Sequence, residues 1–131
     1  MNIGKINNMS GKLYVHKVFP HDISHEVGFT QEVHFLFFNS SYYLPFTMSG
    51  SEYIYNVTVN DATDLRFGGD FKSMLPHTLS VGDFICIEKN GAKYNLSVTS
   101  KNSDAAKRYN MILGARQRHI IFENDRVVYK R

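Results

Sequence analysis

The chain has 131 residues, of which 43% are hydrophobic and 14% aromatic, and its formal net charge is +3. This length supports one sizeable core and is short for two ordinary domains, while the aromatic content is typical of a folded, strand-rich protein rather than a disordered one. No apolar run approaches the roughly 20 residues of a membrane helix and the start MNIGKINNMSGK is polar, so we expect a soluble, intracellular protein.

The charge is divided unevenly along the chain. Residues 1–100 carry seven Lys or Arg against nine Asp or Glu, whereas residues 101–131 carry eight against three. This asymmetry predicts a basic face or tail that attracts phosphates, and a solvated terminus or a linker would explain it equally well. The single cysteine, Cys86, excludes an intramolecular disulfide and a multi-cysteine zinc site, and its place within FICIE predicts a core position.

In the first half of the chain, alternating apolar residues predict short strands. The expected elements are a strand at 12–19, an exposed loop at 20–29 with room for one helical turn, a strongly apolar strand at 31–38, and a shorter strand around 42–46. Pro45 suggests that the last of these lies at a sheet edge. The segment EYIYNVTVN at 52–60 has the clearest period of two and predicts a half-buried strand.

In the second half, turn and capping residues delimit the elements. The sequence predicts a short strand at 65–67, a two-turn helix at 70–75 capped by Asp70, a hairpin of 84–89 and 93–99 with a type I′ turn at Asn90 and Gly91, a helix from the N-cap Ser103 to Gly114, and a strand at 118–122. Residues 126–131 form a last strand or the start of a linker to a downstream domain, after a single domain at 1–125. With seven or eight short strands and two short helices, a mainly β, antiparallel barrel or sandwich is favoured over a βαβ fold.

Two segments, taken together, resemble the DNA-binding pseudobarrel family, which includes the plant B-three domain and the N-terminal recognition domains of some bacterial restriction enzymes. They are KLYVHKVFPHDISH at 12–25 and the stretch from Tyr55 to Lys89. The residues that fit are Lys17, Val18, Pro20, Asp22 and Ile23 in the first, and Leu65, Gly69, Phe71, Leu79, Gly82, Asp83 and Phe84 in the second. The chain departs from the plant members in having Val59 and Phe71 where they have Trp.

In layout, the chain is most similar to the N-terminal domain of LlaJI-type subunits from McrBC-like, GTP-dependent restriction systems, or to the EcoRII effector domain. The Asn-, Lys-, Phe- and Tyr-rich composition favours the bacterial branch. The resemblance implies an open pseudobarrel that binds double-stranded DNA sequence-specifically in the bacterial cytoplasm. It also implies a GTPase motor and a nuclease outside this chain.

The resemblance further implies two loop arms that straddle the major groove, at 18–26 and 60–64. The candidate DNA contacts are Lys17, His21, Asp22, Ser24 and His25 in the first arm and Asn60, Asp61, Thr63 and Asp64 in the second, with Lys12, Arg66 and Lys72 on phosphates. Asn60 suits adenine readout because its amide donates and accepts at once, although it also suits a turn. Lys107, Arg108, Arg116 and Arg118 either extend the phosphate track or form a solvated surface.

No enzymatic motif is recognisable, and neither a metal site nor a cofactor is expected. A restriction nuclease needs Glu-x-Lys after its Asp, whereas here Lys89 directly follows Glu88. His16, His21 and His25 have no cysteine near them and do not share a single helical face, so they are interpreted as polar arm residues. The alternative function is a protein- or ligand-interaction module with an exposed aromatic patch of Phe37, Phe38, Tyr42 and Tyr43.

Overall fold

The computed structural model describes residues 11–60 and 64–131. Within these residues the chain is mainly β, as predicted, but it has nine strands and four short helices rather than seven or eight strands and two helices. The elements are β1 Lys12–Lys17, α2 Pro20–Ser24, β2 Gly28–Phe29, α3 Gln31–Leu36, β3 Tyr43–Met48, β4 Tyr55–Asn60, β5 Leu65–Phe67, α4 Phe71–Met74, β6 Phe84–Asn90, β7 Lys93–Thr99, α5 Asp104–Ile112, β8 His119–Glu123 and β9 Arg126–Lys130.

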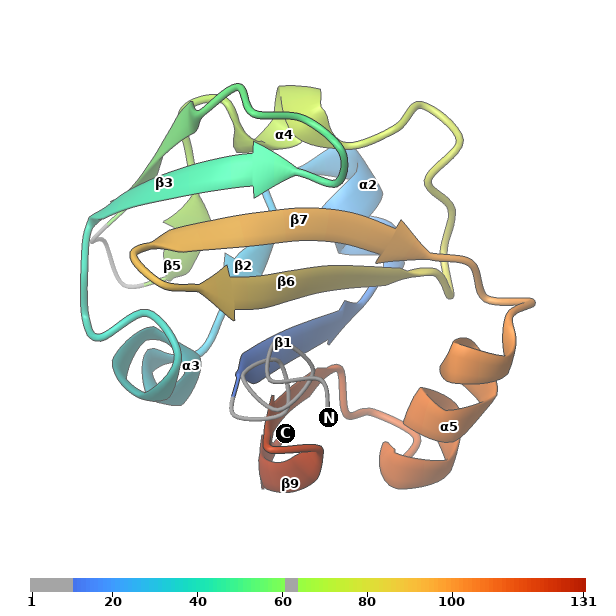
Figure 1. Ribbon diagram of the computed structural model, residues 1–131. Helices are drawn as coiled ribbons and strands as arrows, with labels where there is room; N and C mark the ends of the chain where they lie inside the picture. The colour runs from blue at the N-terminus through green and yellow to red at the C-terminus, as the bar shows by residue number, and fades with distance from the viewer. Residues whose placement is uncertain (1–10, 61–63) are drawn as a thin grey trace.

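The strands form one strongly curled sheet in the order β2-β5-β4-β3-β7-β6-β1-β8-β9, with β2 and β9 at its two edges (Figure 1). All neighbours are antiparallel except β3 and β7, which pair in parallel from Phe46 and Tyr94 onward. The expectation of a purely antiparallel barrel is therefore wrong at this one pair. Parallel neighbours need a long connection, and β4, β5, α4 and β6 provide it.

Two apolar clusters stabilise the fold, one on each face of the central strands. The larger fills the inside of the curled sheet and is rich in aromatic side chains such as Phe46, Phe67 and Phe71. The smaller lies between α5 and the outer face of β1, β6 and β8, and it contains Cys86 as predicted. Because β6 and β8 are buried on both faces over most of their length, they contain the continuous apolar runs FICI and IIF instead of an alternating pattern.

The segment QEVHFLFF, predicted as a strand, forms the helix α3 and the turn that follows it. Thr30 caps the helix by accepting a hydrogen bond from the Val33 backbone N–H at 3.1 Å. Val33 and Phe37 lie one helical turn apart and are both fully buried. A short apolar run of this kind fits a helix and a strand equally well by periodicity, and the Thr cap decides for the helix here.

Pro45 and the hairpin turn also differ from expectation. β3 is an interior strand, and Pro45 is tolerated because it precedes Phe46, the first residue paired with β7. The β6–β7 hairpin is confirmed, with Asn90 opposite Lys93. Its two central residues are thus Gly91 and Ala92, and only Gly91 has positive φ, at 63°, which is the pattern of a type II′ turn rather than type I′.

The C-terminal elements follow the sequence pattern closely. α5 has the predicted N-cap, since Ser103 accepts a hydrogen bond from Ala106 N–H at 3.2 Å. Residues Arg126–Lys130 form the edge strand β9, paired with β8. Whether a linker and a further domain follow stays a prediction. No helix in the described ranges is long and apolar enough to cross a membrane.

Candidate nucleic-acid interface

The two edges of the curled sheet approach each other, and polar side chains bridge them. The Thr30 hydroxyl, just after β2, lies 2.9 Å from the Tyr129 hydroxyl on β9. The Arg131 guanidinium, just after β9, lies 3.4 Å from a carboxylate oxygen of Glu32. We call this contact line the seam, defined by these four residues. Because side chains rather than backbone ladders join the edges, the barrel stays open beside the seam.

A cavity of about 630 Å³ opens beside the seam, and we call it the seam groove. It collects residues from both predicted arms and from the C-terminal part of the chain, with His21 and Glu26 from the first arm and Asp64 from the second. Its basic residues are Arg66, Arg116, Arg118 and Arg131. The arms and the basic C-terminal segment, distant in sequence, therefore border one concave surface.

The arginines of the seam groove differ in their partners. Arg66 pairs with Asp64 at 3.3 Å, and Arg131 pairs with Glu32. Among the described residues, Arg116 and Arg118 have no carboxylate within ion-pair distance. Arg118 instead stacks on the Phe19 ring, with its guanidinium carbon 4.2 Å from the ring centroid. Two of the four positive charges thus remain available to an anionic ligand.

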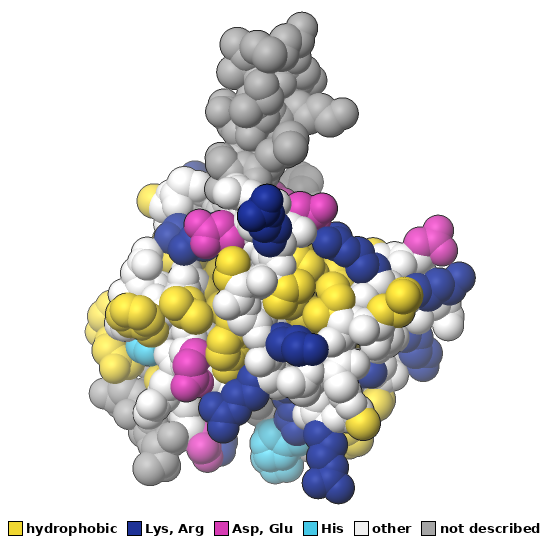
Figure 2. All heavy atoms as spheres, turned by 90° about the horizontal axis from the view of Figure 1, so that it is seen from below, with side chains coloured by type: hydrophobic (Ala, Val, Ile, Leu, Met, Phe, Trp, Pro, Cys, Tyr) yellow, Lys and Arg dark blue, Asp and Glu magenta, His cyan; other side chains and the backbone are white. Residues whose placement is uncertain are grey.

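Basic side chains are also dispersed elsewhere on the surface. Figure 2 shows the face that carries β9 and α5, where Lys and Arg side chains are interspersed with apolar and acidic ones and form no continuous basic sheet. On α5, Arg108 is paired with Asp125 at 2.9 Å and Lys107 with Asp104 at 3.6 Å. The predicted extension of the phosphate track along this helix therefore consists of exposed, paired charges.

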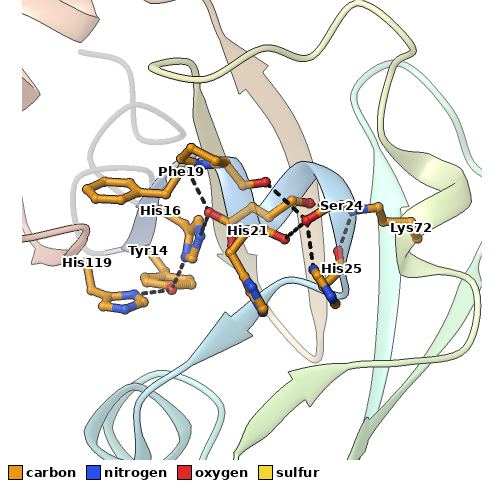
Figure 3. A network of polar contacts seen from close by, with 10 residues as sticks. Tyr14, His16, Phe19, His21, Ser24, His25, Lys72 and His119 are labelled. Carbon is orange, nitrogen blue, oxygen red and sulfur yellow. Dashed lines mark hydrogen bonds and ion pairs between the residues drawn. The ribbon is translucent and has the colours of Figure 1, made fainter.

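The first arm is built around a buried polar network (Figure 3). Asp22, in α2, is 2% exposed and accepts a hydrogen bond from the Phe19 backbone N–H at 2.8 Å. The same carboxylate oxygen lies 3.0 Å from His16 Nε2 on β1, in an electrostatic contact that is not a well-aligned hydrogen bond. Asp22 borders the floor of the groove, but its carboxylate is engaged in holding α2 to β1.

The network continues from His16 to the groove floor. The Tyr14 hydroxyl lies 2.9 Å from His16 Nδ1 and 2.7 Å from His119 Nδ1. Burial, with the nearby His16 and Arg118, lowers the pKa of His119 to about 3, so its imidazole is neutral. Burial alone would raise the pKa of Asp22, but the close contact with His16 and the hydrogen bond from the Phe19 N–H outweigh it, so the pKa is lowered and the carboxylate is ionised.

The exposed side of α2 presents two stacked imidazoles. His21 and His25 lie with ring centroids 4.2 Å apart and 5° between their planes, and Figure 3 shows them side by side. The Ser24 hydroxyl lies 2.7 Å from His25 Nδ1. His21, Ser24 and His25 are therefore at the surface, as predicted, and His21 lines the groove.

Several predicted phosphate contacts have other partners in the structure. Lys72 donates to the backbone carbonyls of Asp22 and His25, at the end of α2 (Figure 3). Lys17 donates to the Asn110 side chain at 2.7 Å, and Lys12 contacts the Leu36 carbonyl at 3.4 Å. None of these three lysines lines the seam groove, whereas Arg66 does.

The second arm is described only at its ends. Asn60 is exposed at the end of β4, opposite Arg66 of β5, and Asp64 lies on the groove. The predicted contacts Asp61 and Thr63 lie outside the described residues. The pattern-based prediction missed Arg131, whose role depends on the folding of β9 against β8. A lone arginine at a chain end carries no sequence signal for this.

Only part of the aromatic patch predicted for the alternative function is exposed. Phe37 and Phe38 are fully buried in the core, so the prediction of their exposure is wrong, because α3 turns them inward. Tyr42 and Tyr43 are exposed, and so are Phe35 and Leu36. In the part of the chain that the structure describes, no group of three His, Cys, Asp or Glu side chains is arranged to hold a metal ion.

Comparison with known proteins finds similarity at the level of the fold. No protein-family model and no curated protein matches the chain. Among solved structures, the N-terminal domain of Helicobacter pylori LlaJI.R1 is similar, with a TM-score of 0.74 and 18% sequence identity. The match covers 85% of this chain and 97% of that one. The chain therefore has the fold of a LlaJI-type N-terminal domain, which confirms the layout predicted from the two sequence segments.

Proposed function

We propose that this chain is a non-catalytic domain that binds double-stranded DNA with its seam groove. The observation that carries the proposal is the convergence of both arms and four arginines on one concave surface, two of those arginines having no carboxylate partner among the described residues. The shared fold with the N-terminal domain of a LlaJI protein supports it. A mixed surface of this kind favours oriented contacts over purely electrostatic attraction.

We further propose that the two arms enter the major groove and recognise a specific sequence. A major groove about 12 Å wide admits protruding loops but not the body of a barrel. In this proposal Asn60 stays a candidate for adenine readout, and exposed His21 and His25 contact the duplex from the first arm. The domain serves target recognition in a bacterial restriction system of the cytoplasm, with the GTPase motor and the nuclease supplied outside this chain.

The first experiment measures duplex binding and its dependence on salt. Mixed-sequence duplexes are titrated with the protein in gel-shift assays over a series of salt concentrations. We expect Arg116→Ala to weaken binding to all duplexes and to reduce the slope of log affinity against log salt by about 0.9, the contribution of one phosphate contact. Arg116 is chosen because it is exposed and has no carboxylate partner within the described ranges.

Lys93→Ala is the matched control, because Lys93 is an exposed lysine of the β6–β7 hairpin and does not line the groove. It should leave both affinity and slope unchanged. Absence of wild-type binding at low salt would refute the DNA proposal. Binding that is equally reduced by both variants would place the interface elsewhere on the molecule.

A further inference from the structure

We propose that Arg118 reads a base through the seam groove and selects guanine. The inference rests on the proposed function, because it names the chemistry that one groove residue recognises in DNA. Arg118 is the groove arginine that combines three properties: a fixed backbone, a stacked guanidinium and no ion-pair partner among the described residues.

The backbone of Arg118 is held from two directions. Its N–H donates to the carbonyl of Arg131 at 2.8 Å, and its carbonyl accepts from the N–H of Lys17, on β1, also at 2.8 Å. The residue therefore lies between a core strand and the C-terminal end of the chain. Because the backbone is fixed in this way, the positions that the Arg118 side chain can occupy in the groove are restricted.

The guanidinium is oriented by Phe19. The ring of Phe19 lies under it at 4.2 Å, and Phe19 is itself fixed because its N–H donates to the buried carboxylate of Asp22. Stacking on a ring face leaves the edge of the guanidinium, with its N–H donors, free to point elsewhere. The Arg118 side chain is thus already ordered in the free protein, so it loses less conformational entropy on binding than a flexible arginine would.

The charge balance around Arg118 differs from that around its neighbours. Arg66 and Arg131 are paired with Asp64 and Glu32, which reduces their attraction for a ligand. Arg118 interacts electrostatically with the Asp22 carboxylate, but that carboxylate is already in contact with His16 and accepts a hydrogen bond from the Phe19 N–H. His119 on the groove floor is neutral and does not compete for the guanidinium.

The donor geometry of arginine matches guanine better than any other base. Two parallel N–H groups of the fork meet two acceptors, O6 and N7, on the major-groove edge of guanine, whereas adenine presents a donor at the position of O6. A phosphate also accepts bidentate donation from arginine, so a phosphate contact is the competing outcome. Orientation by Phe19 favours base readout, since a phosphate can be contacted by an exposed side chain that has no such support, as in the case of Arg116.

The test begins with selection from a random duplex library, using the wild type, Arg118→Lys and the control Arg126→Lys, at an exposed arginine of β9 outside the seam groove. We expect the wild type and Arg126→Lys to enrich a guanine at a defined position. Arg118→Lys, which keeps the charge but loses the planar fork, should bind mixed-sequence DNA within about threefold of the wild type and lose roughly tenfold or more of the guanine preference. Equal guanine enrichment by Arg118→Lys and the wild type would overturn the inference.

A second measurement avoids any change to the protein. In the selected duplex, the guanine is replaced by 7-deazaguanine, which lacks N7, or by inosine, which keeps both O6 and N7. We expect the wild type to lose about tenfold in affinity with 7-deazaguanine and little with inosine. Unchanged affinity with 7-deazaguanine would mean that Arg118 contacts phosphate. Failure of the wild type to bind any duplex would refute the proposed function itself, whereas sequence-independent binding would refute only the guanine inference.

Discussion

At the scale of single residues, the core of this barrel contains an extended polar chain from Asp22 through His16 and Tyr14 to His119. A hydroxyl has one proton, so the Tyr14 hydroxyl can donate to one imidazole only and must accept from the Nδ1–H of the other. The tautomers of the two histidines are thereby linked. Because this chain joins α2 to the groove floor, its main role is to position the first arm.

Removal of the Tyr14 hydroxyl should lower the free energy of unfolding. Tyr14→Phe leaves a buried imidazole nitrogen without its partner, so we expect a loss of about 1–3 kcal/mol in the free energy of unfolding, measured by urea denaturation. Tyr94→Phe is the control, because Tyr94 is also a core residue but its hydroxyl makes no hydrogen bond among the described residues. It should change the same free energy by less than about 0.5 kcal/mol. Equal losses would contradict a structural role for the polar chain.

The depressed pKa of His119 makes stability depend on pH. The unfolded chain binds a proton at an ordinary histidine pKa near 6.5, whereas the folded protein does so only at about 3. Acid therefore favours unfolding, and the free energy of unfolding should fall as pH decreases below about 6.5, by up to about 1.4 kcal/mol per pH unit. Asp22, whose folded pKa is also lowered, adds a loss of the same sign at still lower pH.

The measurement is urea denaturation at a series of pH values between about 7.5 and 4.5. His119→Asn keeps a polar group near the Tyr14 hydroxyl but does not titrate. We expect its pH slope to be smaller than that of the wild type by about one proton. If both proteins had the same slope in this range, another group would be responsible.

At the scale of elements, Lys72 connects α4 to the first arm by hydrogen bonds. Its ammonium group donates to two carbonyls at the end of α2, where a cation also interacts favourably with the helix terminus. The sequence-based role for Lys72 was a phosphate contact. The structure supports a clamp between the short helices instead, since Lys72 does not line the groove.

Loss of this clamp should loosen α2 alone. We expect Lys72→Met to accelerate hydrogen exchange of the His25 amide, which bonds to the His21 carbonyl, by roughly fivefold, corresponding to about 1 kcal/mol. Amides of the β6–β7 hairpin should be unaffected. Lys93→Met provides the control for loss of one surface charge. Unchanged exchange at His25 would show that the clamp contributes nothing to arm stability.

At the scale of the whole molecule, the groove beside the seam is the surface at which we propose that DNA binds. Four carboxylates, those of Asp22, Glu26, Glu32 and Asp64, line the groove together with four arginines. The formal charges of these eight groups cancel, and the ion pairs at the rim of the groove limit non-specific attraction. A groove with this balance should bind DNA weakly unless the arms also make specific contacts.

Neutralising one rim carboxylate should strengthen binding to every duplex. Glu32→Gln removes the partner of Arg131, and we expect affinity for mixed-sequence DNA to rise roughly two- to tenfold at low salt, with the gain disappearing at high salt. Glu88→Gln, at an exposed position of β6 outside the groove, should have no such effect. A similar gain in both variants would indicate only a change in net charge.

Much of the fold follows from local pattern. Val57 and Val59 alternate with exposed residues along β4, the β6–β7 hairpin has its turn signal, and α5 has its serine cap. The failures occur where local signals are ambiguous or short. The apolar run at 31–38 suits a helix and a strand equally, and β2 has only two residues. Burial of Phe37 and Phe38 follows from the helix, which the run itself does not specify.

The sequence by itself determined the mainly β class, because strand periodicity, turns and caps are local properties of the chain, and the resemblance of two segments to a known family indicated the pseudobarrel layout. Only the tertiary structure decided which charges meet. Arg131 and Glu32, 99 residues apart, pair because the sheet curls until its edges touch. Arg118 lies over Phe19 because β1 and β8, distant in sequence, pair as neighbours in the sheet. Contacts across the seam depend on strand order and curvature, which no local pattern encodes.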